Sequence, residues 1–120
     1  MTRVYIAGPY SADNVMDVLH NIRLGIDMSY KVFCEGMAPF CPWLDFHYVL
    51  RDWQHNLGID DFYKYSLAWL EVSDAVLVIG NWQLSAGTRN EVAYALKHEI
   101  PVFYELANLI KWKEKENGKT

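Results

Sequence analysis

Short apolar runs, separated by longer stretches with helical spacing, constrain the fold of this chain more than any other feature. The clearest run is Ala75–Ile79, which is apolar at every position and rich in β-branched residues. Three further strand-like runs are Val4–Ala7, Met37–Cys41 and Ile100–Tyr104. A strand that is buried on both faces is apolar throughout, whereas a half-exposed strand alternates. The pattern therefore predicts a parallel sheet that is covered on both faces.

Helices are predicted between these runs. Asp13 or Asn14 is a candidate cap of the first helix, apolar residues recur at helical spacing up to Val32, and Gly36 stands where a helix C-terminal glycine belongs. Further helices are expected over 60–72, over 88–98 and after residue 104. Residues 43–58 fit a short amphipathic helix or an ordered flap. The predicted fold class is α/β: a flavodoxin-like or Rossmann-like doubly wound parallel sheet of about four strands with helices on both faces.

Composition excludes several classes of protein. The 120 residues predict one domain over 1–120, and residues 111–120 form a polar helix end or tail. The net charge of −4, with no cationic cluster before that tail, argues against polymeric nucleic acid as a partner. Cys34 and Cys41 have no histidine at metal-ligand spacing, so no metal site is expected. Without a signal-like or membrane-spanning run, the expected location is the cytoplasm.

Two loops mark the predicted ligand site. Ligands of doubly wound folds bind at the carboxyl ends of the strands, near the switch in strand order. Here those ends are Gly8-Pro9-Tyr10 and the loop 80–87. Small residues in the second loop precede a helix, whose positive N-terminus favours an anionic group, and the Ser85 hydroxyl adds a donor.

Glu91 has two interpretations from the residues alone. Thr88 and Glu91 have the spacing of a capping box, in which each side chain satisfies a backbone donor of the other residue. Alternatively, the Glu91 carboxylate lies at the rim of the pocket and attacks an anomeric carbon.

An ordered set of segments carries a family resemblance. The segments are Val4–Tyr10, Asp74–Ile79, and Ser85–Ala95 followed by Ile100-Pro101-Val102. Together they resemble the nucleoside 2-deoxyribosyltransferase family and its relatives, the 2′-deoxynucleoside 5′-phosphate N-hydrolases, with short bacterial and phage domains looking closer still. The resemblance covers roughly residues 3–104, and 43–58 match poorly. It implies cleavage or transfer of an N-glycosidic bond with retained configuration, no cofactor, and a homo-oligomer.

The resemblance also implies roles for individual residues. Glu91 falls on the nucleophilic glutamate of the family, and Tyr5 on a tyrosine near that nucleophile, although a buried strand aromatic is the equal alternative. Gly8 and Pro9 match the turn that shapes the sugar pocket. Ser85 stands where hydrolases of nucleoside monophosphates carry serine, which predicts a 5′-phosphorylated ligand; the alternative is a plain loop serine.

One position departs from the family pattern. Hydrolase relatives place an aspartate before a Leu-Ala-Trp-Leu run, and here Ser66 precedes Leu67–Leu70. A hydroxyl cannot act as a general acid near neutral pH. Asp60 or Asp61 might substitute from an earlier turn, or merely favour the helix N-terminus. A nucleotide-binding module without catalysis is therefore the alternative function.

The remaining assignments concern the rest of the site. Gly87 and Thr88 are assigned to the ligand together with Ser85. Loop aromatics near the mouth are expected to include one or two that stack on a base: Tyr10, Trp43, Phe46 and Trp82. Asp74 starts a strand at the opposite end of the sheet. No role is assigned to His47 or His55.

Overall fold

Four parallel strands form one sheet in the order β2-β1-β3-β4. The computed structural model describes residues 1–54 and 56–118. The strands are β1 (Arg3–Ala7), β2 (Ala38–Phe40), β3 (Ala75–Val78) and β4 (Val102–Phe103). Each predicted strand is present, and the edge strands are shorter than their apolar runs. The predicted α/β class is confirmed.

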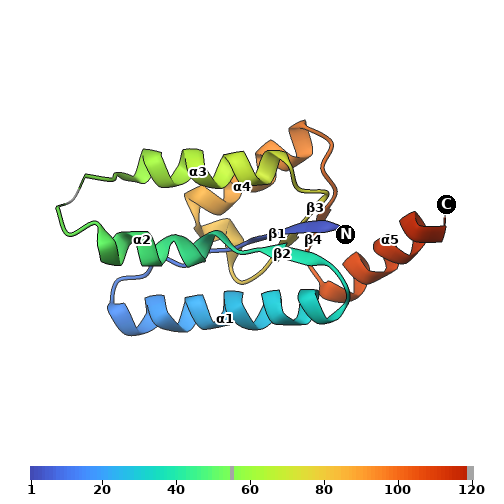
Figure 1. Cartoon of the computed structure of the whole chain (residues 1–120), viewed down its shortest axis with the longest axis horizontal. Helices are drawn as coiled ribbons and strands as arrows, with labels where there is room; N and C mark the ends of the chain where they lie inside the picture. The colour runs from blue at the N-terminus through green and yellow to red at the C-terminus, as the bar shows by residue number, and fades with distance from the viewer. Residues whose placement is uncertain (55, 119–120) are drawn as a thin grey trace.

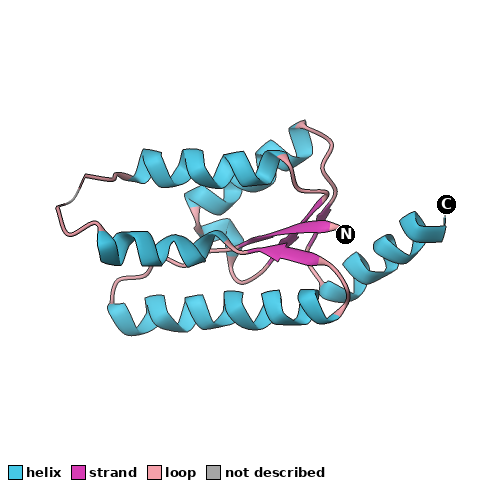
Figure 2. Ribbon diagram, in the orientation of Figure 1, coloured by secondary structure: helices cyan, strands magenta, loops and turns pink. Residues whose placement is uncertain are grey.

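Helices cover both faces of this sheet (Figure 1, Figure 2). The α-helices are α1 (Val15–Cys34), α2 (Phe46–Arg51), α3 (Ile59–Glu71), α4 (Ala86–Lys97) and α5 (Leu106–Gly118). Two short 3₁₀ segments are η1 (Pro42–Asp45) and η2 (Trp82–Leu84). In Figure 1, α1 and α5 lie on one side of the sheet, and α3 and α4 lie on the other.

The alternation of side chains along β1 divides the core in two. Val4 and Ile6 belong to a cluster completed by α1 and α5, whereas Tyr5 and Ala7 belong to a cluster completed by α3 and α4. All four side chains are fully buried. Because successive side chains of a strand point to opposite faces, one strand supplies both layers of packing.

The ends of α1 follow the local sequence. Asn14 is the N-cap, and its Oδ1 accepts a hydrogen bond from the Asp17 backbone N–H at 2.9 Å. Gly36 follows the helix with φ +81°, a conformation that glycine adopts without steric cost. Asp74 lies at the amino end of β3, where its Oδ2 accepts from the Arg3 backbone N–H at 2.8 Å. The expectation that Asp74 lies opposite the ligand end is confirmed.

The sequence left the stretch 43–58 open. Its described residues, 43–54 and 56–58, belong to η1, to α2 and to the connection toward α3. Its anchor is Trp43, which is 3% exposed. The indole ring packs so closely on α1 that a Cβ atom at Gly25 would overlap it. At Gly8 a Cβ would lie 2.7 Å from Trp43 Cζ2 and 2.8 Å from the Ile79 carbonyl oxygen. Two glycines thus make room for one tryptophan at the carboxyl edge of the sheet.

Candidate functional site

The candidate site lies at the switch in strand order. The chain moves from β1 to β2 on one side and then crosses to β3 on the other, so β1 and β3 are neighbours whose following loops diverge. A cavity of about 270 Å³ opens beyond their carboxyl ends. Seven of the residues predicted for the site line it: Gly8, Tyr10, Ser66, Ser85, Gly87, Thr88 and Glu91.

Three other predicted residues do not line this cavity. Tyr5 is fully buried in β1, where its side chain packs with the α3 and α4 layer. Pro9 lines a second cavity, which shares Trp43 and Ser85 with the first one. Trp82 packs against Tyr104, with ring centroids 5.6 Å apart. Trp82 lies in the loop after β3, as predicted. It belongs to the short η2 segment, and its ring packs against the core cluster on the α3 and α4 side of the sheet.

The start of α4 decides between the two interpretations of Glu91. The helix begins at Ala86 with Ser85 as its N-cap. The Thr88 backbone N–H and the Thr88 hydroxyl donate to Ser85 Oγ at 3.2 Å and 3.0 Å. A capping box needs its acidic residue three positions after the cap, and Glu91 lies six positions after it. The capping-box interpretation of Thr88 and Glu91 is therefore wrong.

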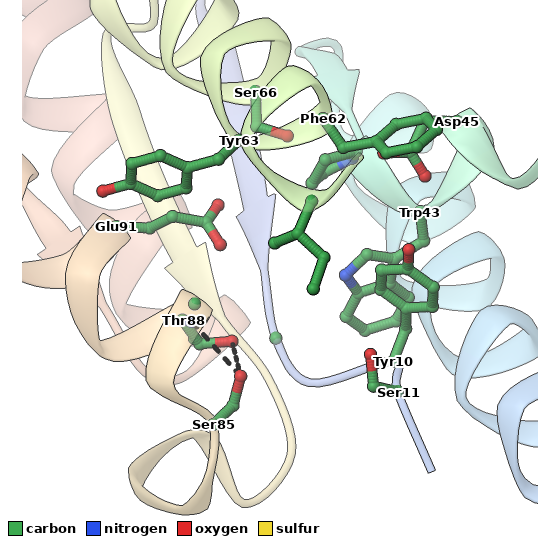
Figure 3. Close-up of a pocket in the computed structure, with 14 residues that line it drawn as sticks. Tyr10, Ser11, Trp43, Asp45, Phe62, Tyr63, Ser66, Ser85, Thr88 and Glu91 are labelled. Carbon is green, nitrogen blue, oxygen red and sulfur yellow. Dashed lines mark hydrogen bonds between the residues drawn. The ribbon is translucent and has the colours of Figure 1, made fainter. Parts of the chain in front are cut away.

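Glu91 instead directs its carboxyl group into the cavity (Figure 3). Its Oε2 atom is buried and has no hydrogen-bond partner among the described residues. Burial raises the pKa of Glu91 to about 7, the nearby Tyr5 hydroxyl opposes that shift by favouring the charged form, and the charge of Asp45 adds to the shift. Near neutral pH, the carboxyl group is therefore divided between its two protonation states.

The Tyr5 hydroxyl interacts with this carboxyl group from within the core. Burial and then the negative charge of Glu91 raise the pKa of the Tyr5 hydroxyl, which stays protonated at physiological pH. Its oxygen is buried and has no partner that meets hydrogen-bond geometry within the described residues. A phenol that keeps its proton next to a carboxylate can donate to it without competing for the negative charge.

Asp45 is a carboxyl group of the site that sequence reasoning missed. It closes η1, lines the cavity, and is 4% exposed. Its Oδ1 atom is buried without a hydrogen-bond partner in the described chain, and burial raises the pKa of Asp45 to about 6. The available signal was its place soon after the carboxyl end of β2, because the carboxyl ends of parallel strands share one edge of the sheet.

The aspartates proposed as substitutes at the Ser66 position lie elsewhere. Asp61 Oδ2 accepts from the Gly58 backbone N–H at 2.8 Å and thereby caps α3. Neither Asp60 nor Asp61 lines the cavity. Ser66 itself is 8% exposed and forms part of the cavity wall. Ile59, Phe62 and Tyr63 of the same turn line the cavity, so the two aspartates lie on the side of that turn away from it and are not placed to substitute at the Ser66 position.

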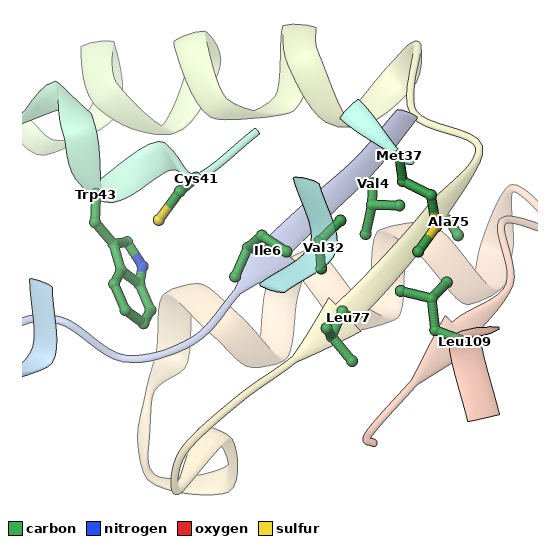
Figure 4. Close-up of a cluster of buried hydrophobic side chains, with 9 residues drawn as sticks. All are labelled: Val4, Ile6, Val32, Met37, Cys41, Trp43, Ala75, Leu77 and Leu109. Carbon is green, nitrogen blue, oxygen red and sulfur yellow. The ribbon is translucent and has the colours of Figure 1, made fainter. Parts of the chain in front are cut away.

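Aromatic side chains form much of the remaining wall. Tyr10 and Trp43 line the cavity with ring centroids 6.4 Å apart, and Phe62 and Tyr63 contribute from α3. Trp43 also belongs to the main core cluster (Figure 4). The Phe46 side chain and His55 lie outside the described part of the structure. His47 is exposed on α2.

A family model described as "Domain of unknown function (DUF7768)" matches residues 2–105. The chain belongs to this family. A comparison with curated protein sequences found no match.

Solved structures share the fold of this family member. A 2-deoxyribosyltransferase from Bacillus psychrosaccharolyticus is 17% identical, with a TM-score of 0.57, over 91% of this chain and 79% of that one. A conserved protein from Enterococcus faecalis V583 is 20% identical, with a TM-score of 0.55, over 85% of this chain. The present chain spans 61% of the length of that second protein. Similarity at this level of identity establishes the fold.

Two further observations concern the described residues alone. None of the helices between residues 1 and 118 is long and apolar enough to cross a membrane. Within the same part of the chain, His, Cys, Asp and Glu side chains do not gather in threes as metal ligands would. The homo-oligomer and the 5′-phosphorylated ligand stay predictions.

Proposed function

We propose that this protein cleaves the N-glycosidic bond of a nucleoside or nucleotide, with Glu91 as the nucleophile. The observation that carries the proposal is the Glu91 carboxyl group, which faces a cavity at the switch in strand order and is not used as a helix cap. A buried carboxyl oxygen without a partner costs free energy, so its placement in a cavity calls for a ligand. The fold shared with a 2-deoxyribosyltransferase agrees with this chemistry.

The reaction follows from the groups around Glu91. A Glu91 oxygen attacks C1′ as the base departs, which gives a glycosyl ester, and water or a second base then takes the sugar from the ester. The ionised form of Glu91 attacks, and the Tyr5 hydroxyl favours that form. The same negative charge stabilises an oxocarbenium-like transition state.

A 5′-monophosphate is the proposed form of the substrate. Ser85 and Thr88 place two hydroxyl groups at the N-terminus of α4, where the positive end of the helix dipole favours an anion. A carboxylate at the Ser85 position would repel a phosphate at close range. Both residues line the cavity that contains Glu91, as a nucleotide spanning sugar and phosphate requires.

A second candidate function is nucleotide binding without cleavage. Ser66 favours it, because this residue lines the cavity at the position where the resembling hydrolases carry an aspartate. A serine hydroxyl does not release a proton near neutral pH and cannot replace that group.

Base release from a substrate panel tests the proposal. Ribo and deoxyribo nucleosides and their 5′-monophosphates are incubated with the wild-type protein, with Glu91→Gln, and with Glu114→Gln as a matched control on the exposed face of α5. We expect one substrate class to lose its base with the wild type and the control, and not with Glu91→Gln. Absence of release from every substrate, together with thermal stabilisation by a nucleotide, would establish the binding module instead.

A further inference from the structure

The carboxyl group that the Ser66 position lacks is present elsewhere in the same cavity. Asp45 enters from η1, on the side opposite Glu91 in Figure 3, and Ser66 lies on α3 between them in that view. Asp45 is 4% exposed, and its Oδ1 atom has no hydrogen-bond partner among the described residues. Two carboxyl groups from different elements thus face one cavity, each with an unpartnered oxygen.

A structural role for Asp45 does not account for this placement. Its side chain does not cap α2, and among the described residues the ion pair within 4 Å joins Lys31 to Asp27, not a cation to Asp45. A buried carboxyl oxygen without a hydrogen-bond partner destabilises a fold, and an apolar residue at this position would pack without that cost. A carboxyl group that lowers the stability of the fold and lies at the edge of a ligand cavity is expected of a reacting group.

We propose that Asp45 is the general acid of this site: it protonates the departing base while Glu91 attacks C1′. This inference rests on the proposed function and adds the residue that replaces the missing aspartate. Purine and pyrimidine bases leave poorly as anions, and a proton delivered to the base removes that barrier. Such a proton transfer contributes typically about 10²–10⁴-fold to the rate.

The step balances as follows. A Glu91 oxygen forms a bond to C1′, the C1′–N bond breaks, and its electron pair stays on the base, which takes the proton of Asp45. Asp45 is then an ionised base, and it accepts a proton from the water that attacks C1′ of the ester. The ester bond breaks, Glu91 regains its negative charge, and Asp45 regains its proton. The net change is addition of water across the N-glycosidic bond.

The pKa values of Asp45 and Glu91 allow one of them to carry the proton while the other is ionised. The pKa of Asp45 is about 6 and that of Glu91 is about 7, both raised first by burial. One proton is therefore shared by the pair near neutral pH. A difference of about one pKa unit is about tenfold in population, so the form with the proton on Asp45 and the charge on Glu91 is present in the free protein. Positive charge that develops at C1′ next to Glu91 favours the same form.

Two substrates that differ in their leaving group test the role of Asp45. One is a purine deoxynucleoside 5′-monophosphate, and the other is its N7-methylated counterpart, whose cationic base departs as a neutral molecule without a proton. Wild type, Asp45→Asn and Glu91→Gln are compared on both, after subtraction of spontaneous hydrolysis. Asparagine keeps the shape of the side chain, and thermal unfolding of each variant verifies that it folds.

The expected result is selective. Asp45→Asn loses about 100-fold or more on the ordinary purine substrate and less than about tenfold on the methylated one, whereas Glu91→Gln loses activity on both. Equal losses by Asp45→Asn on the two substrates, or no loss, would overturn the role of Asp45 while leaving the proposed function intact. If the wild type cleaves neither substrate, the proposed function fails first, and the role of Asp45 fails with it.

Discussion

The Trp43 indole ring occupies the space that a side chain at Gly25 would need, and so ties the cavity wall to the middle of α1. Cys41 lies against the same position, and its thiol is also within contact distance of a Cβ built at Gly25. Trp43 lines the cavity and belongs to the core, so any shift of its ring changes both. The shape of the site thus depends on a helix that contributes no predicted catalytic residue.

Gly25→Ala is expected to destabilise the protein. Alanine in a helix is ordinarily more stable than glycine by roughly 0.5–1 kcal/mol, but here the methyl group overlaps the Trp43 ring, and overpacking costs about 1–3 kcal/mol. Urea unfolding measures the difference. Gly118→Ala is the control, because a Cβ at that position meets nothing within 4 Å. A Gly25→Ala variant as stable as Gly118→Ala would show that the Trp43 ring can move aside at little cost in free energy.

The free energy of unfolding is expected to fall as the pH rises from 5 to 8, because Glu91 ionises in this range. Burial raises its pKa from 4.5 to about 7, so the folded protein binds the proton more tightly than the unfolded chain does. The contribution is fully present below the unfolded pKa and is lost as the pH rises through the folded one. The loss of unfolding free energy is at most about 3 kcal/mol, since each unit of pKa difference between the folded and unfolded states corresponds to roughly 1.4 kcal/mol.

Urea unfolding of Glu91→Gln at the two pH values measures this contribution. The glutamine side chain does not ionise, so the variant should lose less stability than the wild type as the pH rises. Glu114→Gln, an exposed change on α5, should keep the full decline of the wild type. A decline in Glu91→Gln as steep as in the wild type would contradict the burial of an ionisable carboxyl group at this position.

Ser85→Asp is expected to separate helix capping from phosphate binding. Aspartate is as good an N-cap as serine, so the stability of α4 is retained, whereas Ser85→Ala loses about 0.5–2 kcal/mol with the bond from the Thr88 N–H. The new negative charge repels a phosphate, so affinity for a nucleoside 5′-monophosphate should fall at least tenfold. Affinity for the free nucleoside should change little. Titration calorimetry with both ligands decides, and equal losses would place the phosphate elsewhere.

The pH dependence of base release is expected to differ between the two leaving groups. With an ordinary purine nucleotide, kcat/KM needs Glu91 charged and Asp45 protonated, so its profile is a bell with limbs near pH 6 and pH 7. With the N7-methylated counterpart only the ionisation of Glu91 matters, and the alkaline limb disappears. Titration of the substrate phosphate is common to both profiles.

Three titratable groups that interact with Asp45 do not ionise in this range. Tyr10 and Tyr65 have pKa values raised mainly by burial, and burial raises the pKa of the Cys41 thiol to about 11. All three stay neutral up to pH 8. An alkaline limb that persists with the methylated substrate would assign it to a group other than Asp45.

Local sequence predicted the parts of the site that lie directly after strands β1 and β3. Gly8 and Tyr10 follow the apolar run of β1, Ser85 lies in the loop after β3, and Glu91 lies on the helix after that loop. Their place at one edge of the sheet follows from parallel strand order. The local pattern predicted a helix that starts at Thr88, whereas α4 starts at Ala86. Thr88 and Glu91 have the spacing of a capping box, and Ser85 and Thr88 have the spacing of the actual cap.

Asp45 could not be found from periodicity, because η1 and α2 are too short to show any. Six residues of α2 make less than two turns, and their apolar positions fit a helix, a strand end or a flap equally well. The position of this segment is set by Trp43, which inserts between Gly25 of α1 and the turn at Gly8. No local rule connects an aspartate with a glycine on a helix twenty residues earlier.

The sequence by itself determined the parallel sheet, the helices on its two faces and the loops at its ligand edge, because apolar runs and helical spacing are local consequences of burial. The tertiary structure alone decided that Glu91 is free of the helix cap and that Asp45 faces the same cavity. Both facts depend on which side chains are removed from water together. Desolvation and charge proximity are properties of the packed molecule, and they set the pKa values on which the proposed chemistry depends.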